Sequence, residues 1–287
     1  MNKIKVIVDS TVDMSLEKLK ELDVDMLPLS VNINNCDYLD YVEIKWNELI
    51  EKVKTYKTLP KTSAISVGTF VTTFEKYTNE GYDVIFLSLG SHFSCNYNNA
   101  ITAKELVDGN IYIIDSQNLS SAIGLQLLKI IKMKNEGLSA EEIVKKMEDI
   151  VQRTQTETAL ETMEYLYKGG RCSGIKYLIG SLLRLYPIVK VNKEITVHKL
   201  GKVTFRNALD IIISDFKKDL DDGNVDMDYI IISSVGNKKA QNYMYNKISE
   251  FFDSKKILLY DAGCVVSTHC GPGTTGFFYI KNKNPKA

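Results

Sequence analysis

The sequence predicts an α/β fold in two parts, an N-terminal three-layer α/β/α domain with a mostly parallel sheet and a C-terminal α/β domain with a mixed sheet. The chain has 287 residues, a length at which one core commonly divides into two. In the first half, runs that are apolar throughout alternate with helical patterns, which is typical of a parallel sheet covered on both faces. Beyond residue 156 a hairpin pattern replaces that alternation. We therefore expect domains at 1–156 and 157–287.

Three apolar runs predict the strands of the first sheet, and each run ends in a polar loop before a helix. The runs cover residues 4–8, 84–87 and 111–114, and they lead into Asp9-Ser10-Thr11, residues 88–94 and Asp115-Ser116. The carboxyl ends of parallel strands lie along one edge of a sheet, where ligands usually bind. We expect these polar loops to form one rim.

Apolar residues at helical spacing predict the helices between these strands. Ser15 and Ser66 stand where N-caps are expected, and Ser139 with Glu142 fits a capping box. An amphipathic run follows the third strand, because its apolar residues recur at helical spacing. The expected helices cover residues 16–22, 67–77, 96–107, 125–133 and 140–155.

The second half predicts a hairpin followed by alternating helices and strands. Residues 187–191 and 194–200 are apolar and β-branched runs separated by Asn192-Lys193, a pair typical of a two-residue hairpin turn. The later pattern predicts helices at about 205–221 and 238–252, and strands at 229–233, 257–260 and 277–280. Since no long linker separates the halves, we expect an extensive interface between them.

Composition excludes several classes of function. Thirty-six basic and 36 acidic residues leave no net charge, so the basic patch expected of a nucleic-acid-binding protein is missing. No apolar run is long enough to span a membrane and the amino terminus is unlike a signal peptide, which predicts a soluble cytoplasmic protein. Five scattered cysteines and three histidines argue against structural disulfides and against a metal site.

Residues 164–173 are the most informative segment for function. Gly169 and Gly170 precede Arg171, and an apolar run at 177–185 follows. Paired glycines allow a ligand to approach the backbone closely, and a guanidinium offers a planar fork suited to a carboxylate or phosphate. The segment indicates a site for an anionic head group beside an apolar surface. A plain surface turn is the alternative.

Hydroxyl groups and one histidine are further candidates. Thr62 and Ser63 precede the helix expected at 67–77, whose first N–H groups attract anions. Ser94 precedes the helix expected at 96, where it is either a cap or a ligand donor. His269 lies in a segment with three glycines and a proline, which predicts a tight turn before the last strand. A purely structural histidine is the alternative.

Together these features resemble the DegV family, bacterial fatty-acid-binding proteins that include the FakB components of fatty acid kinase systems. The resemblance extends over essentially the whole chain. Its most specific matches are Arg171 after Lys-Gly-Gly and His269 with the following Gly-Pro-Gly. The other matching segments are Asp9-Ser10-Thr11, Thr62-Ser63, residues 91–100, Asp115-Ser116, residues 164–170 and residues 180–183.

The resemblance implies an acyl carboxylate at the junction of the two domains, with the acyl chain in a closed apolar tunnel of the first domain. It implies that Arg171 and His269 form the polar surround from the second domain. Hydroxyl and amide donors to the carboxylate would come from Thr62, Ser63, Ser94 and Asn96. The sequence departs from the family at Ala64-Ile65, where Gln-Pro is common, and at Cys95-Asn96, where Gly-Thr is common.

The function implied is a carrier that binds a long-chain fatty acid and presents its carboxyl group to a separate fatty acid kinase for acyl phosphate formation in phospholipid metabolism. The carrier would have no catalytic residue, cofactor or metal, and the chain lacks the P-loop pattern for ATP. An acyltransferase and transient membrane contact are further interactions that the resemblance allows.

Two alternatives stay open on sequence. One is an acyl-ester or thioester hydrolase with Ser94 as nucleophile, His269 as base and Asp9 or Asp115 as the orienting acid. The other is a lipid-sensing binding protein that does not hand its ligand on.

Overall fold

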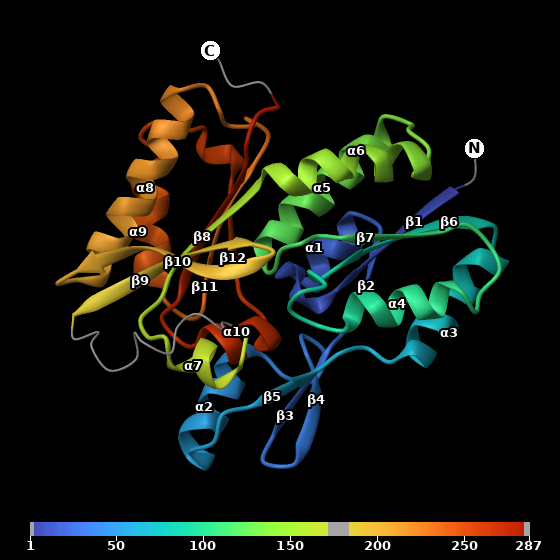
Figure 1. Cartoon of the computed structure of the whole chain (residues 1–287), viewed down its shortest axis with the longest axis horizontal. Coiled ribbons are helices and arrows are strands. Elements are labelled where there is room, and N and C mark those ends of the chain that lie inside the picture. Colours follow the sequence, from blue (N-terminus) through green and yellow to red (C-terminus); the bar gives the residue numbers. More distant parts are fainter. Residues whose placement is uncertain (1–2, 172–183, 284–287) are drawn as a thin grey trace.

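The computed structural model describes residues 3–171 and 184–283, which form three β-sheets with helices around them (Figure 1). The first sheet has the strand order β2–β1–β6–β7, and all of its pairings are parallel. Its strands are β1 (Lys3–Asp9), β2 (Val24–Leu27), β6 (Tyr82–Ser88) and β7 (Ile111–Asp115). The predicted parallel sheet is confirmed, and β2 is an edge strand that the prediction missed.

Helices cover both faces of this sheet, as the fold class predicts. One face carries α3 (Val67–Asn79) and α4 (Asn96–Lys104), and the other carries α5 (Ser121–Asn135) and α6 (Ala140–Arg153). Ser66 caps α3, and Ser139 with Glu142 forms the predicted capping box of α6. Two further helical segments follow β1, η1 (Ser10–Val12) and α1 (Leu16–Glu21), and Ser15 caps α1.

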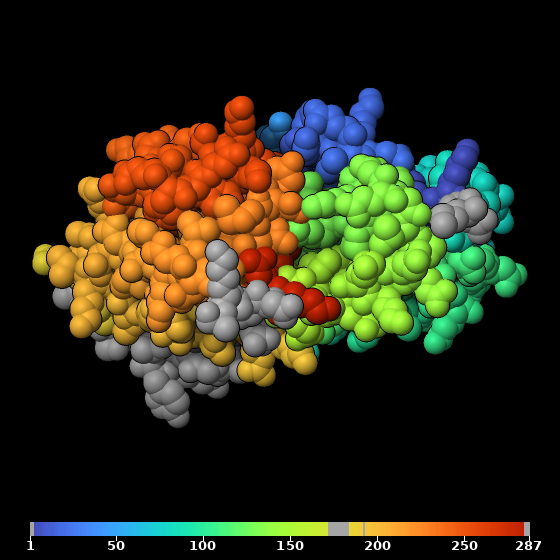
Figure 2. Space-filling view, turned by 90° about the horizontal axis from the view of Figure 1, so that it is seen from above, coloured from blue at the N-terminus to red at the C-terminus, as the bar shows by residue number. Residues whose placement is uncertain are grey.

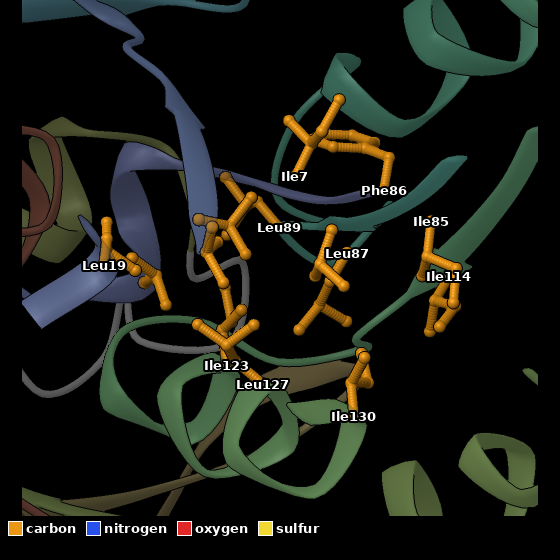
Figure 3. Packing of buried hydrophobic residues seen from close by; sticks show 14 of the residues in the cluster. Ile7, Leu19, Ile85, Phe86, Leu87, Leu89, Ile114, Ile123, Leu127 and Ile130 are labelled. Carbon is orange, nitrogen blue, oxygen red and sulfur yellow. The ribbon is translucent and has the colours of Figure 1, made fainter. Parts of the chain in front are cut away.

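Side chains on the two faces of β6 show how alternation along a strand builds the layers. Phe86 faces α3, where its ring contacts Phe70 and Phe74 at centroid distances of 5.0 and 6.4 Å. Leu87, the next residue, lies on the other face toward Ile123 and the rest of α5 (Figure 3). Successive residues of a strand point to opposite faces, so one apolar run fills two layers.

The second large sheet is mixed, as predicted. Its order is β10–β9–β8–β13–β11–β12, with β11 and β12 parallel and the other pairs antiparallel. Helices α8 (Phe205–Asp221) and α9 (Lys238–Ile248) pack against it. Its strands are β8 (Thr154–Ala159), β9 (Leu185–Asn192), β10 (Glu194–Lys202), β11 (Ile230–Ser234), β12 (Ile257–Asp261) and β13 (Thr275–Ile280); a 3-10 turn, η2 (Ser254–Lys256), precedes β12.

Several element boundaries differ from the prediction for local reasons. The predicted hairpin is confirmed, but its strands reach Asn192 and Glu194, so only Lys193, at φ 62°, separates them. The helix expected to reach residue 155 ends at Arg153, because the β-branched segment from Thr154 pairs as β8. The short third sheet was missed altogether, since its strands are brief and partly polar: β3 (Ser30–Ile33), β4 (Cys36–Leu39) and β5 (Lys61–Ser63).

Helix α5 lies between the two large sheets. It contacts β6 on one side and β8, β11 and β13 on the other, and residues 121–127 are all buried. These first turns are therefore not amphipathic, because a helix covered on opposite sides needs apolar residues around most of its circumference. Farther along, Lys132 is exposed while Ile131 and Met133 are buried, as the predicted amphipathic pattern requires. The two halves, residues before β8 and residues from β8 onward, meet along a continuous contact in Figure 2. The domain division at residues 156 and 157 stays a prediction.

Three short helices complete the described structure and lie near the junction of the halves in Figure 1: α2 (Trp46–Tyr56), α7 (Glu164–Lys168) and α10 (Cys264–Cys270). Helix α10 contacts α7 in the C-terminal half and α2, β3, β5 and η1 in the N-terminal half. Within residues 3–171 and 184–283, no helix is both long enough and apolar enough to cross a bilayer.

Candidate functional site

A cavity of about 350 Å³ lies where the two halves meet. Such a volume is in the range of small-molecule sites, ~300–1,000 Å³. Most of its wall is apolar, and polar side chains from both halves also line it. The apolar residues are Leu29, Ala64, Leu89, Phe93, Leu119, Leu166, Ile195, Val265 and Val266, and the polar ones include Thr11, Thr62, Ser63, Ser94, Arg171 and His269.

Thr62 and His269, from the two halves, meet in the cavity wall. Strand β5 places Thr62 opposite Val31, and the last turn of α10 places His269 beside it. The distance from Thr62 Oγ1 to His269 Nε2 is 2.9 Å, although the two residues are 207 positions apart in the chain. The fold thus brings together two groups that the sequence singled out separately.

The imidazole of His269 is held against a glycine on its other side. A Cβ atom on Gly169 would lie 2.5 Å from Nδ1, so a side chain there would displace the ring. Nδ1 itself is buried without a hydrogen-bond partner in the described part of the chain. One ring nitrogen therefore meets Thr62 while the other has a spare hydrogen-bonding capacity.

His269 is neutral in this setting. Burial lowers its pKa to about 4, and the positive charge of Arg171 acts in the same direction. A neutral imidazole carries one N–H donor and one acceptor nitrogen, so it can donate to an anion without itself being charged.

We expect the imidazole of His269 to stay neutral until the pH falls to about 4. Between this value and the unfolded value of 6.5 the unfolded chain binds more protons than the folded one, so the stability contributed by His269 is lost as the pH falls through that window. NMR titration of the ring protons, assigned with a His269→Gln variant, measures the pKa directly. Titration near 6.5 would contradict the buried environment.

Arg171 lies at the exposed part of the cavity wall. Its Nη1 donates to the carbonyl oxygen of Gly169 at 2.6 Å, which folds the side chain back over the Gly169-Gly170 turn, where Gly170 has φ 69°. The guanidinium therefore stands near the cavity but is not buried in it. The predicted apolar run at 177–185 and the matching residues 180–183 lie outside the described residues, apart from 184 and 185.

Ser63 and Ser94 also line the cavity, whereas Asn96 does not belong to its wall. The side chain of Asn96 is fully buried, donates to Asp9 at 2.8 Å and accepts from the amide of Ile65 at 3.3 Å. The amide of Asn96 in turn donates to Ser94 Oγ at 3.2 Å. Asn96 thus stabilises the neighbouring loops, whereas the residue before it, Cys95, lines the cavity.

The predicted polar rim forms at the carboxyl edge of the parallel sheet. Its aspartate side chains accept hydrogen bonds from neighbouring residues. Asp9 accepts from the amide of Leu89 at 2.7 Å, and Asp115 accepts from the hydroxyl of Ser91 at 2.6 Å. Burial raises the pKa of Asp9, while these donors oppose that effect. Within the described residues neither acid bonds to His269, which pairs with Thr62 instead of Ser94, so the Ser-His-acid geometry of a hydrolase is not formed.

The segment around His269 differs from the tight turn expected. Residues 264–270 form helix α10, and the turn begins only at Gly271, with φ 80°. Gly271 to Gly276 also has the spacing G-x-G-x-x-G, but it connects a helix to strand β13. A dinucleotide cradle connects a strand to a helix, so this segment is a turn.

Sequence reasoning missed part of the cavity wall. Thr11 belonged to a recognised polar loop, and its buried hydroxyl reaches both the cavity and Asp9, at 2.5 Å from the carboxylate. Leu29 and Ile195 come from segments that were not singled out for function, and Leu166 lies in the informative segment 164–173 but was not itself a candidate. Apolar residues are common throughout a chain, so nothing local distinguishes these from core residues.

Comparison with known proteins assigns the chain to a family. A family model described as an uncharacterised protein of the DegV family matches residues 3–282. A DegV domain-containing protein of Clostridium perfringens is 31% identical over 290 residues, which cover 98% of this chain and 99% of that protein.

Solved structures agree with this assignment. The structure described as DegV, a fatty acid binding protein from Bacillus subtilis, has a TM-score of 0.84 at 27% identity and covers 98% of this chain and 100% of that one. A stearic acid-binding protein from Eubacterium ventriosum has a TM-score of 0.87 at 26% identity and covers 97% and 98% of the two chains. The chain described here belongs to the DegV family.

Proposed function

We propose that this protein binds a long-chain fatty acid, with the carboxylate at the Thr62–His269 pair and the acyl chain along the apolar wall of the cavity. The observation that carries the proposal is the combination of that hydrogen-bonded pair with a largely apolar wall in one cavity between the halves. Relatives described as a fatty acid binding protein and as a stearic acid-binding protein support it.

The chemistry of the head group fits these residues. A buried carboxylate needs several hydrogen-bond donors, because its transfer from water is costly when they are missing. Thr62, Ser63 and Ser94 offer hydroxyls, and neutral His269 offers one N–H. Arg171 supplies a positive charge at the exposed side of the site. The hydrocarbon chain supplies affinity at roughly 0.8 kcal/mol for each buried methylene.

Mass spectrometry of an organic extract of the purified protein tests the ligand. We expect a fatty acid of long chain length at a stoichiometry of about one per chain, because it should occupy the cavity in which the Thr62–His269 pair adjoins a largely apolar wall. Protein stripped of lipid should bind stearic acid again. An extract without fatty acid, together with no binding of added stearic acid by the stripped protein, would refute the proposal.

We further propose that the bound carboxyl group is presented to a separate kinase, which forms the acyl phosphate. Phosphoryl transfer requires positioned ATP and metal ions, and the P-loop pattern is missing from the sequence. We expect Arg171 to contact both the head group and the kinase, and its exposure beside the cavity supports this role. An acyltransferase would then consume the acyl phosphate.

Replacing Arg171 with alanine is expected to lower phosphorylation of the bound acid by about tenfold, since a charge-assisted contact is worth ~1.5–3 kcal/mol. The measurement is acyl phosphate formation with the matching kinase and loaded protein. Arg206→Ala is the matched control, because Arg206 is also exposed but stacks on Tyr243, away from the cavity wall. Equal rates for the Arg171 variant and the wild type would contradict the role.

A further inference from the structure

Helix α10 carries His269 at one end, and two aspartates of the other half hold its opposite end. Asp40 accepts from the amides of Cys264 and Val265 at 2.8 and 3.2 Å, and Asp13 accepts from the amide of Gly263 at 2.8 Å. The first N–H groups of a helix have no partner within the helix. Three of these groups on α10 are therefore satisfied from the N-terminal half.

The fit between these elements is close. A Cβ atom on Gly263 would lie 2.4 Å from the ring of Tyr41 and 3.0 Å from Asp40 Oδ2. The hydroxyl of Tyr41 reaches Asp13 at 3.4 Å and the carbonyl oxygen of Asp261 at 3.2 Å. Because a side chain at position 263 would collide with two residues, α10 has little freedom to shift along this contact.

The cluster of Asp13, Asp40, Tyr41 and Ser120 is energetically costly. Asp13, Tyr41 and Ser120 all have positive φ angles, of 52°, 64° and 59°. With ψ −148°, Ser120 lies in a region that is populated almost only by glycine, yet its hydroxyl contacts Asp13 at 2.5 Å. Strained residues persist at a cost of ~1–3 kcal/mol each and gather at functional sites.

Burial adds to this cost. Both carboxyl groups are only 1% exposed, and burial raises the pKa of Asp13 to about 8 and that of Asp40 to about 6. A buried carboxyl group is costly unless hydrogen-bond donors surround it, and here the donors include three amides at the start of α10. The cluster therefore links buried and strained residues to the position of this helix.

The connection to the cavity runs along one short helix. His269 is five residues after Cys264, which is about 7.5 Å along a helix axis. Val265, whose amide donates to Asp40, and the next residue, Val266, line the same cavity. A movement at the start of α10 would thus move both the apolar wall and the imidazole that meets Thr62.

We propose that Asp40, supported by Asp13, is a positioning residue for the fatty-acid site, because it fixes helix α10 so that His269 meets Thr62. The inference rests on the proposed function for its effect on the ligand, but not for its effect on His269. Asp40 is not in the cavity wall and acts only through α10.

The test compares three variants. Asp40→Ala removes both acceptor oxygens, and Asp40→Asn keeps the shape and one of them. Lys129→Met is the matched control, because Lys129 of α5 also joins the halves, through ion pairs of 2.7 Å to Asp226 and Asp228, but does not touch α10. Thermal unfolding shows that each variant is folded.

The first readout is the NMR titration of His269 without ligand, and the second is the affinity for stearic acid. In Asp40→Ala we expect the pKa of His269 to rise from about 4 toward 6.5, and the dissociation constant to rise about tenfold. Asp40→Asn should give intermediate values, and Lys129→Met should leave both near the wild type.

Two results would overturn the proposal. One is an unchanged His269 titration in folded Asp40→Ala or, if that variant does not fold, in Asp40→Asn. The other is an equal change in Lys129→Met, which would show general loosening of the interface. If the wild-type protein binds no stearic acid, the proposed function fails, while the His269 titration still decides whether Asp40 positions the imidazole.

Discussion

Shortening the fatty acid from sixteen to twelve carbons is expected to raise its dissociation constant about 200-fold. Four methylenes at roughly 0.8 kcal/mol each amount to about 3 kcal/mol, and 1.4 kcal/mol corresponds to a factor of ten. The effect is this large because the cavity wall that would face the acyl chain is mainly apolar, with residues such as Leu29 and Val266. Titration calorimetry on protein stripped of lipid measures both constants.

The matched control separates the tail from the head group. Thr62→Val removes the hydroxyl that meets His269 and keeps a similar shape. This variant should raise the dissociation constants of both fatty acids by the same factor, about tenfold for one lost hydrogen bond in a buried site. The ratio of the two dissociation constants should therefore stay unchanged. Equal affinity of the wild type for the two acids would show that the chain is not buried.

Replacing Phe216 with alanine is expected to lower the free energy of unfolding by about 3–5 kcal/mol. Phe216 of α8 is 1% exposed and lies among four aromatic rings, with centroid distances of 4.8 Å to Phe277 and 5.2 Å to Tyr279. Truncation leaves a cavity that the surrounding rings, Phe277 and Tyr279 of β13 with Phe251 and Phe252, cannot fill. Urea denaturation measures the change.

Phe251→Ala is the control for that experiment. Phe251 contacts the same ring at 6.2 Å but is only partly buried at the edge of the cluster. Its truncation should cost clearly less, because water can reach the space left behind. Equal losses for the two variants would contradict the central place of Phe216 in this core.

Local patterns predicted the main layers of the fold, because the spacing of apolar residues and the helix caps can be recognised within a few residues of sequence. The run at 84–87 is apolar on both faces, and the structure buries both of them, as Phe86 and Leu87 illustrate. The strands around Thr62 were not predicted. A three-residue strand such as Lys61–Ser63 owes its conformation to its pairing with β3 rather than to its own sequence.

The candidate site was only partly predictable for a related reason. Arg171 and His269 stood out through their glycine-rich surroundings, and Thr62 through its position before a helix. That Thr62 meets His269 depends on the contact between β5 and α10, which no local pattern encodes. Asn96 was expected to face the ligand, but its amide satisfies buried Asp9, a requirement that appears only once the loops are folded.

Helix α5 has a consequence for how a cargo enters and leaves. The buried residues of α5 pack against both large sheets. Separating the two halves would therefore expose apolar surface of α5 to water, which is unfavourable. For the proposed fatty-acid ligand, we therefore expect loading to need only small movements near Arg171, where the cavity wall is exposed, rather than separation of the two halves.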